Sequence, residues 1–266
     1  CWARTLPMYE RIRSGDIAGA VAIHRQLLDE VERAADPGTE DLATAIVSSA
    51  LFFGRVGEAR RANARASASH DPALYEALIE YYSGDATKAK RHLVPSRKTS
   101  GETIAVEVWL RARLGDTTRG EQVIRQNWIV ANPSRQAVEG GLAIAGGDAA
   151  KGIRLIEEAL PKLSPGGTYY REVEVLATAW MRRGDTDRAI GFLKQASARR
   201  AFVYHDLMPF SPFWVRDELL LAEAFVQARQ YPEARKVADG LRRLLAFADP
   251  EFPLLARLRR LEQQLQ

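Results

Sequence analysis

Imidazole and thiol groups, which proteins use most often to bind metal ions or to act as nucleophiles, are rare in this sequence. The 266 residues contain one cysteine and four histidines, namely Cys1, His24, His70, His92 and His205. No two histidines are four residues apart, and a single cysteine cannot supply a Cys-x-x-Cys pair. The sequence therefore predicts no metal site, and we expect no cofactor.

Motifs for acyl or phosphoryl transfer are also missing from the sequence. There is no Gly-x-Ser-x-Gly elbow, and the glycines at 140, 141, 146 and 147 lack the Gly-Lys-Ser/Thr ending of a phosphate-binding loop. Small residues at a tight helix crossing explain these glycines better. A triad assembled in space from distant residues stays open, but the sequence favours a protein that is not an enzyme.

Arginine carries the net charge of +4 and often occurs in pairs. Arginines gathered on one helical face could follow a phosphate backbone, so nucleic-acid binding is one alternative function. Acidic residues alternate with the arginines, as at Glu172 and Glu174. A mixed-charge, solvated helical surface is therefore the favoured interpretation, and nucleic acid is a disfavoured partner.

The elements that must position any binding residues are indicated by a repeated phrase. Gly-Asp, three variable residues and a small residue begins at positions 15, 84, 115, 147 and 184, and looser copies begin at Gly54 and Arg229. The middle copies recur about every thirty-two residues, a period typical of stacked helix pairs. No segment alternates convincingly between apolar and polar residues, so we expect essentially no sheet.

The copy at Gly184 shows how the phrase would form a hairpin. Gly184 can end one helix in the left-handed conformation, and Asp185 can cap the next helix by accepting from its free N–H groups. Ala189 would lie one turn further on, where a small side chain lets the two helices approach closely. Each copy therefore predicts two antiparallel helices joined by a very short turn.

This pattern resembles the tetratricopeptide repeat over nearly the whole chain. Around Gly184 the packing positions of that family are matched by Leu176, Ala177, Trp180, Ala189 and Ala196. The resemblance implies one all-α domain over residues 1–266, a right-handed superhelical solenoid of about seven helix pairs. A final helix over 250–264 would cap its open end.

The C-terminal part has a second, more specific resemblance. The stretches 219–224, 231–235 and 248–255 are similar to the last repeat and closing helix of bacterial multidomain proteins. In those proteins the repeats follow a Ser/Thr kinase or a winged-helix DNA-binding module. The resemblance implies a bacterial regulatory or signalling protein in which this chain is a non-catalytic protein- or peptide-binding scaffold.

The tetratricopeptide resemblance also implies which side chains face a concave groove. The first helix of each pair lines that groove, mainly with residues two, three and six positions before the turn. These positions predict a partner-binding set of aromatic, apolar and arginine side chains: Tyr9, Ile12, Arg13, Tyr81, Tyr82, Trp109, Arg113, Met181 and Arg182. Rings would bury apolar area of a peptide and guanidinium groups would bind its carboxylates, although each ring could instead pack between repeats.

The longest break in the period is an aromatic, proline-containing segment that we expect to be an irregular loop over 199–214. Two prolines in it prevent a continuous helix. Its predicted partner-binding residues are Phe202, Tyr204, Phe210, Phe213 and Trp214. A segment this apolar must be buried, and the alternatives are a satellite core or a contact with a partner.

Cys1 leaves the setting of the chain open. It is either an accident of a domain boundary or the lipid-bearing first residue of a bacterial envelope lipoprotein, in which case the chain would be an assembly scaffold. No apolar run in the sequence approaches the length of a membrane span. The expected partner is another protein or a peptide, self-association is open, and the compartment is either the bacterial cytoplasm or the periplasm.

Overall fold

The structure is a computed structural model that describes residues 2–33, 40–66, 71–94, 101–127, 132–164, 166–199 and 211–266. Within these ranges the chain is helical without any strand, which confirms the all-α class. The described residues form fifteen α-helices and one short 3-10 helix in this order: α1 (Trp2–Ser14), α2 (Ile17–Arg33), α3 (Glu40–Phe52), α4 (Val56–Asn63), α5 (Pro72–Tyr82), α6 (Ala86–His92), α7 (Gly101–Arg113), α8 (Thr117–Asn127), α9 (Pro133–Ala145), α10 (Ala149–Ala159), η3 (Leu160–Lys162), α11 (Gly167–Arg182), α12 (Thr186–Ala198), α13 (Pro212–Gln227), α14 (Tyr231–Leu244) and α15 (Pro253–Gln264). None of these helices is both long enough and apolar enough to cross a membrane.

Consecutive helices from α1 to α14 pack as seven pairs, and each pair is joined at a copy of the repeated phrase. The six glycines of these turns all have φ between 74° and 98°, and Arg229 takes the same role in the last turn with φ 59°. In four turns the aspartate caps the second helix. The Asp185 carboxylate, for example, accepts a hydrogen bond from the Arg188 N–H at 3.1 Å.

The glycines of α9 and α10 form a tight helix crossing, as the sequence indicated. A Cβ atom on Gly152 would lie 2.4 Å from the Gly140 carbonyl oxygen and 2.9 Å from the Ile144 backbone nitrogen. This contact explains why Gly152 stands where most other copies of the phrase have alanine. Even a methyl group would collide with backbone that cannot rotate away.

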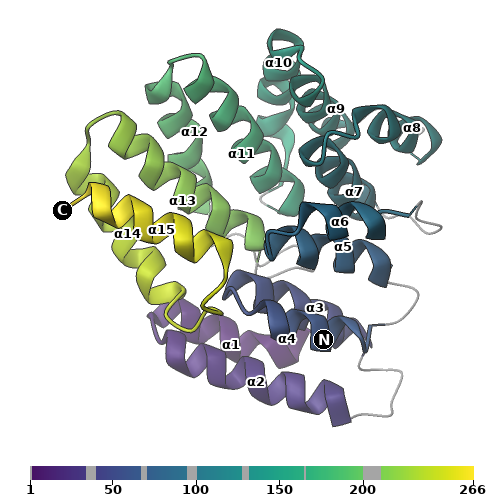
Figure 1. The fold of residues 1–266 in the computed structure, drawn as a ribbon, viewed down its shortest axis with the longest axis vertical. Helices are drawn as coiled ribbons and strands as arrows, with labels where there is room; N and C mark the ends of the chain where they lie inside the picture. Colours follow the sequence, from purple (N-terminus) through teal and green to yellow (C-terminus); the bar gives the residue numbers. More distant parts are fainter. Residues whose placement is uncertain are drawn as a thin grey trace.

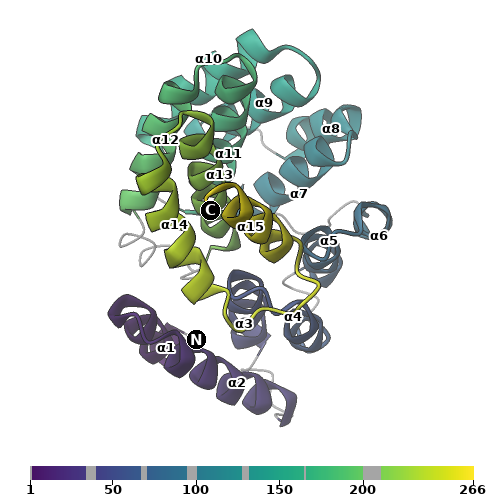
Figure 2. The ribbon, with the colours of Figure 1, turned by 60° about the vertical axis from the view of Figure 1, so that its left-hand side comes forward.

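The first helices of successive pairs also pack against one another, from α3 through α5, α7, α9 and α11 to α13. Helix α13 additionally packs against α3, so the last pair returns to the second pair. Figures 1 and 2 show the pairs following a closing arc in which α14 and α15 lie near α3 and α4.

The C-terminal segment contacts the turn between α3 and α4. The Asp249 N–H donates to the Gly54 carbonyl at 3.0 Å, and the Asp249 carboxylate accepts from the Gly57 N–H at 3.0 Å. Arg55 donates to the Phe247 carbonyl at 2.6 Å. Helix α15 was expected to cap a free end of the array. It packs on α13 and α14, which form the last pair, and the segment before it also contacts the turn between α3 and α4.

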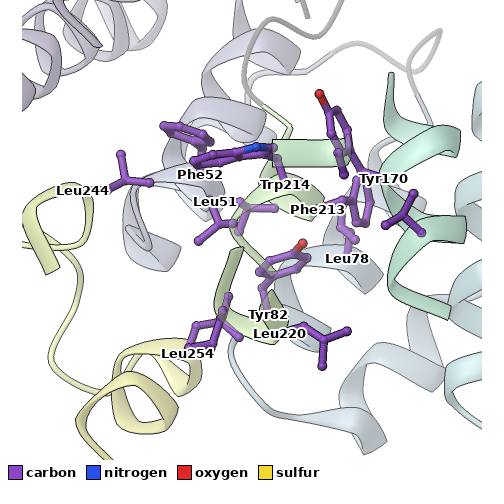
Figure 3. Packing of buried hydrophobic residues seen from close by; sticks show 14 of the residues in the cluster. Leu51, Phe52, Leu78, Tyr82, Tyr170, Phe213, Trp214, Leu220, Leu244 and Leu254 are labelled. Carbon is purple, nitrogen blue, oxygen red and sulfur yellow. The ribbon is translucent and has the colours of Figure 1, made fainter. Parts of the chain in front are cut away.

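The main hydrophobic core lies around α13, which inserts its first turns among the first helices of other pairs. Phe52 stacks on Trp214 with ring centroids 6.1 Å apart. Phe213 makes edge contacts with Trp109 at 5.1 Å and Tyr82 at 6.3 Å. Figure 3 shows Phe52 beside Trp214 and the ring of Phe213 close to Leu78. The core therefore joins residues from the third, fifth, seventh and thirteenth helices.

Candidate functional site

The predicted aromatic loop is shorter at its C-terminal end than expected. Phe202, Tyr204 and Phe210 lie outside the described residues. Phe213 and Trp214 belong to the first turn of α13, because Pro212 starts this helix at a position where its missing N–H costs nothing. Both side chains are buried in the core, with exposed fractions of 1% and 6%.

Three of the predicted groove aromatics come together, but they do not form an open platform. Tyr81 makes edge contacts with Tyr82 at 6.1 Å and with Trp109 at 5.1 Å. The guanidinium group of Arg216, from α13, lies between 5.2 and 5.8 Å from the centroids of all three rings. Helix α13 therefore covers the part of the inner face where the resemblance implied open space.

The remaining groove residues are divided between buried and exposed positions. Tyr9 and Ile12 on α1 are buried, and Met181 on α11 is half-buried. Arg13 and Arg182 are exposed. In Figures 1 and 2 helix α1 lies well away from α7 and α11, so the predicted set does not form one continuous surface.

A buried ion network lies beneath the aromatic cluster. Glu174 accepts from Arg216 Nη2 at 2.7 Å, and Arg113 Nη2 lies 3.0 Å from the same carboxylate. Burial alone would raise the pKa of Glu174, but the charges of Arg216 and Arg113 lower it to about 2. Sequence reasoning missed Arg216, because nothing in its local pattern distinguishes it from the many solvent-facing arginines.

Two neighbouring carboxyl groups have the opposite environment. Burial raises the pKa of Glu172 to about 8, because the nearby charges of Arg171 and Arg113 only partly offset it. Burial also raises the pKa of Asp217 well above its ordinary value. Neither Glu172 Oε2 nor either oxygen of Asp217 has a hydrogen-bond partner among the described residues. Burial therefore favours the protonated form of both carboxyl groups, and for Glu172 that form predominates at neutral pH and can donate a hydrogen bond.

A pocket of about 270 Å³ between α7, α9 and α11, here named the α7–α9–α11 pocket, contains three of the predicted groove residues. Trp109 and Arg113 line it from α7, and Arg182 lines it from α11 together with Glu172. Gly141 of α9 faces the Glu172 carboxyl: a Cβ atom there would lie 2.6 Å from Oε2. The glycine therefore provides the space that the carboxyl group occupies.

A larger pocket of about 640 Å³, here named the α13–α14 pocket, lies where the turn between α1 and α2 meets α13, α14 and the end of α12. Ile12 and Trp214 line it, both from the sets singled out in the sequence. Its other apolar residues are Ile17, Ala198, Leu221, Phe225, Val237, Leu241 and Leu244. Exposed charged residues surround it, namely Lys194, Glu233, Lys236 and Arg243.

One trio of residues has the composition of a Ser-His-acid triad. His24 Nδ1 lies 2.9 Å from Ser49 Oγ, and His24 Nε2 lies 3.1 Å from Glu58 Oε2. All three residues are buried, they line neither of the two pockets, and Ser49 Oγ donates to the Ile46 carbonyl at 3.1 Å. A substrate has no described route to the serine, so this network holds α2, α3 and α4 together.

Replacing His24 with alanine should lower the free energy of unfolding by about 3 kcal/mol, because it leaves a void and removes a buried partner of Glu58. Chemical denaturation followed by circular dichroism measures this change. His92→Ala, at a partly exposed position on α6, is the matched control and should change stability by less than about 0.5 kcal/mol. Equal stability of the two variants would contradict the structural role.

No protein-family model matches this chain, and no curated protein matches its sequence. The described residues also contain no group of three or more His, Cys, Asp or Glu side chains that could hold a metal ion. The two pockets and the residues that line them are therefore the features of this chain that bear on its function.

Proposed function

We propose that this chain is a non-catalytic scaffold of the tetratricopeptide kind, whose helix pairs wind into a right-handed superhelix and which binds a segment of a partner protein in the α13–α14 pocket. The observation that carries this proposal is the size and composition of the pocket. Most of its lining is apolar, with the buried Glu218 as an exception, and its volume of about 640 Å³ falls in the range of specific binding sites. The C-terminal resemblance leads us to place the scaffold in a bacterial regulatory or signalling protein.

The pocket favours a partner segment with apolar anchors and acidic flanks. Phe225, Val237 and Leu241 come from two neighbouring helices and offer an apolar surface to side chains spaced along one face of a peptide helix. At the rim, three exposed cations stand against the single exposed carboxylate of Glu233. Their charge would steer an acidic segment and add to its rate of association.

Selection from a displayed library of random peptides tests this proposal. We expect enriched peptides that combine apolar residues at helical spacing with Asp or Glu. Gly240 lines the pocket and has open space around its Cβ position, so Gly240→Leu should fill the pocket without disturbing the core. This variant should weaken binding of the selected peptides by about tenfold or more.

Gly191→Leu is the matched control, because Gly191 is also a helical glycine with open space around it but lies outside the pocket. It should bind the selected peptides like the unchanged chain. Absence of any enriched peptide, or equal binding by the two leucine variants, would contradict the proposal. Lys236→Glu should also weaken the binding of acidic peptides. Added salt should reduce the difference in affinity between this variant and the unchanged chain.

A further inference from the structure

We infer that the α7–α9–α11 pocket binds a small carboxylate with a short apolar body, through Trp109, Arg113, Glu172 and Arg182. This inference goes beyond the proposed scaffold role, since it concerns a different pocket formed by other helices. The two pockets share no lining residue.

Two residues that line the pocket have buried hydrogen-bond donors without acceptors in the described part of the chain. Trp109 Nε1 is buried and has no acceptor among the described residues. Arg113 Nε has none either, and Arg113 Nη2 lies near Glu174 without the geometry of a hydrogen bond. Buried donors without acceptors are costly, so a ligand rich in acceptor oxygens would stabilise this arrangement.

Glu172 lies where it can supply a further donor to a ligand in the pocket. Its side chain lines the pocket, only 1% of its surface is exposed, and its Oε2 atom has no partner among the described residues. In the protonated form this oxygen adds another donor at the same place. Thr178 Oγ1 donates its proton to the Glu174 carbonyl, so it offers no donor to the ligand.

The charged groups in and around the pocket are predominantly positive. Glu174 neutralises only one of the two arginines that approach it, Arg113 and Arg216. Arg182 adds an exposed positive charge that has no ion-pair partner among the described residues. A protonated Glu172 does not offset this charge, so the pocket carries a net positive charge and favours an anion.

The size and the lining of the pocket indicate a carboxylate with a short hydrocarbon body. A volume of about 270 Å³ lies just below the usual range for drug-sized ligands. The walls include Val108, Val138, Leu142 and Val175, which suit a short hydrocarbon body. An arginine fork and a protonated carboxyl match the two oxygens of a carboxylate.

Titration of branched short-chain carboxylates, with 4-methylpentanoate as the first probe, tests the inference by calorimetry. We expect saturable binding and at least about tenfold weaker binding of the corresponding amide, which lacks the charge. Trp109→Phe keeps the ring but removes the indole N–H, and it should weaken binding about fivefold. Gly240→Leu should bind the probe like the unchanged chain. Equal binding of acid and amide, or no saturable binding of any probe, would overturn the inference.

The dependence on pH gives a second readout that a structural role would not produce. Glu172 is faced by Arg113 from α7 and by Arg171 and Glu174 from its own helix, and α9 presents Gly141 to it. Above about pH 8 the Glu172 carboxyl ionises, loses its donor and repels the ligand, so affinity should fall. Glu172→Gln keeps an N–H donor and should bind with little change between pH 6 and pH 9. If the Glu172→Gln variant lost affinity above about pH 8 as the unsubstituted chain does, the inference would also be overturned.

The carboxylate could belong to a free organic acid or to an acidic residue of a peptide. A short peptide with one internal aspartate between leucines, titrated beside 4-methylpentanoate, distinguishes these sources. Stronger binding of the free acid supports a small-molecule site. Stronger binding of the peptide identifies a peptide carboxylate as the ligand, and binding of neither contradicts the inference.

Discussion

Gly152→Ala should destabilise the protein by about 3 kcal/mol or more, although it adds a single methyl group to a helix. The new Cβ atom would lie 2.4 Å from the Gly140 carbonyl oxygen, so the two helix backbones of α9 and α10 would have to separate. Alanine favours a helix over glycine by up to about 1 kcal/mol, which is too little to offset this collision. Thermal and denaturant unfolding both measure the loss.

Gly191→Ala is the matched control for this prediction. Gly191 lies in the middle of α12, and nothing occupies the space within 4 Å of its Cβ position. The same substitution there should raise the free energy of unfolding by about 0.5–1 kcal/mol. Equal melting temperatures of the two alanine variants would contradict the close approach of α9 and α10.

The second large effect is expected from Arg216→Met, which should lower stability by about 3–5 kcal/mol. Methionine can fill much of the space among the aromatic rings, but it leaves Glu174 buried with Arg113 as its remaining partner. The double variant Arg216→Met with Glu174→Gln should recover most of the loss, since it also removes the unpaired charge. Denaturant unfolding of the single and double variants gives the coupling between the two residues.

The same pair determines part of the stability below neutral pH. The pKa of Glu174 is lowered from 4.5 to about 2 in the folded chain, so its contribution is fully present above pH 4.5 and is lost as the pH falls toward 2. Arg216→Met should reduce this acid sensitivity. Arg125→Met is the control, because the Arg125–Glu121 pair is exposed and its loss should cost less than about 1 kcal/mol. Similar losses in both arginine variants would contradict the buried network.

The sequence predicted the helix pairs well because their information is local. A glycine that must adopt positive φ and an aspartate that caps the following helix mark each turn without reference to distant residues. The glycines near 140 were also interpreted correctly as a tight crossing. The start of α13 was misjudged, since Pro212 was taken as a helix breaker although proline is favourable in a first turn.

The candidate sites were less predictable, because they depend on contacts between distant pairs. The repeat register identified Trp109, Arg113 and Arg182, which do line one pocket. It could not show that α13 covers Tyr81 and Tyr82, since the register describes each pair only relative to its neighbours. Burial raises the pKa of Glu172, and the nearby charge of Arg216 helps to lower the pKa of Glu174. Neither effect has a local sequence signal.

The contact between Asp249 and the turn at Gly54 depends on the geometry of every turn between these two points of the chain. The hydrogen bonds of Asp249 with Gly54 and Gly57 join residues that are far apart in the sequence, 192 positions in the case of Gly57. They can form only if the angles between successive helix pairs add up to the value that brings the two ends together. A small change at one turn, such as an insertion near Gly115, would be carried through the following pairs and open a gap at Gly54. The geometry of each intervening turn is therefore constrained by the contact at Gly54, although the residues of that turn take no part in the contact.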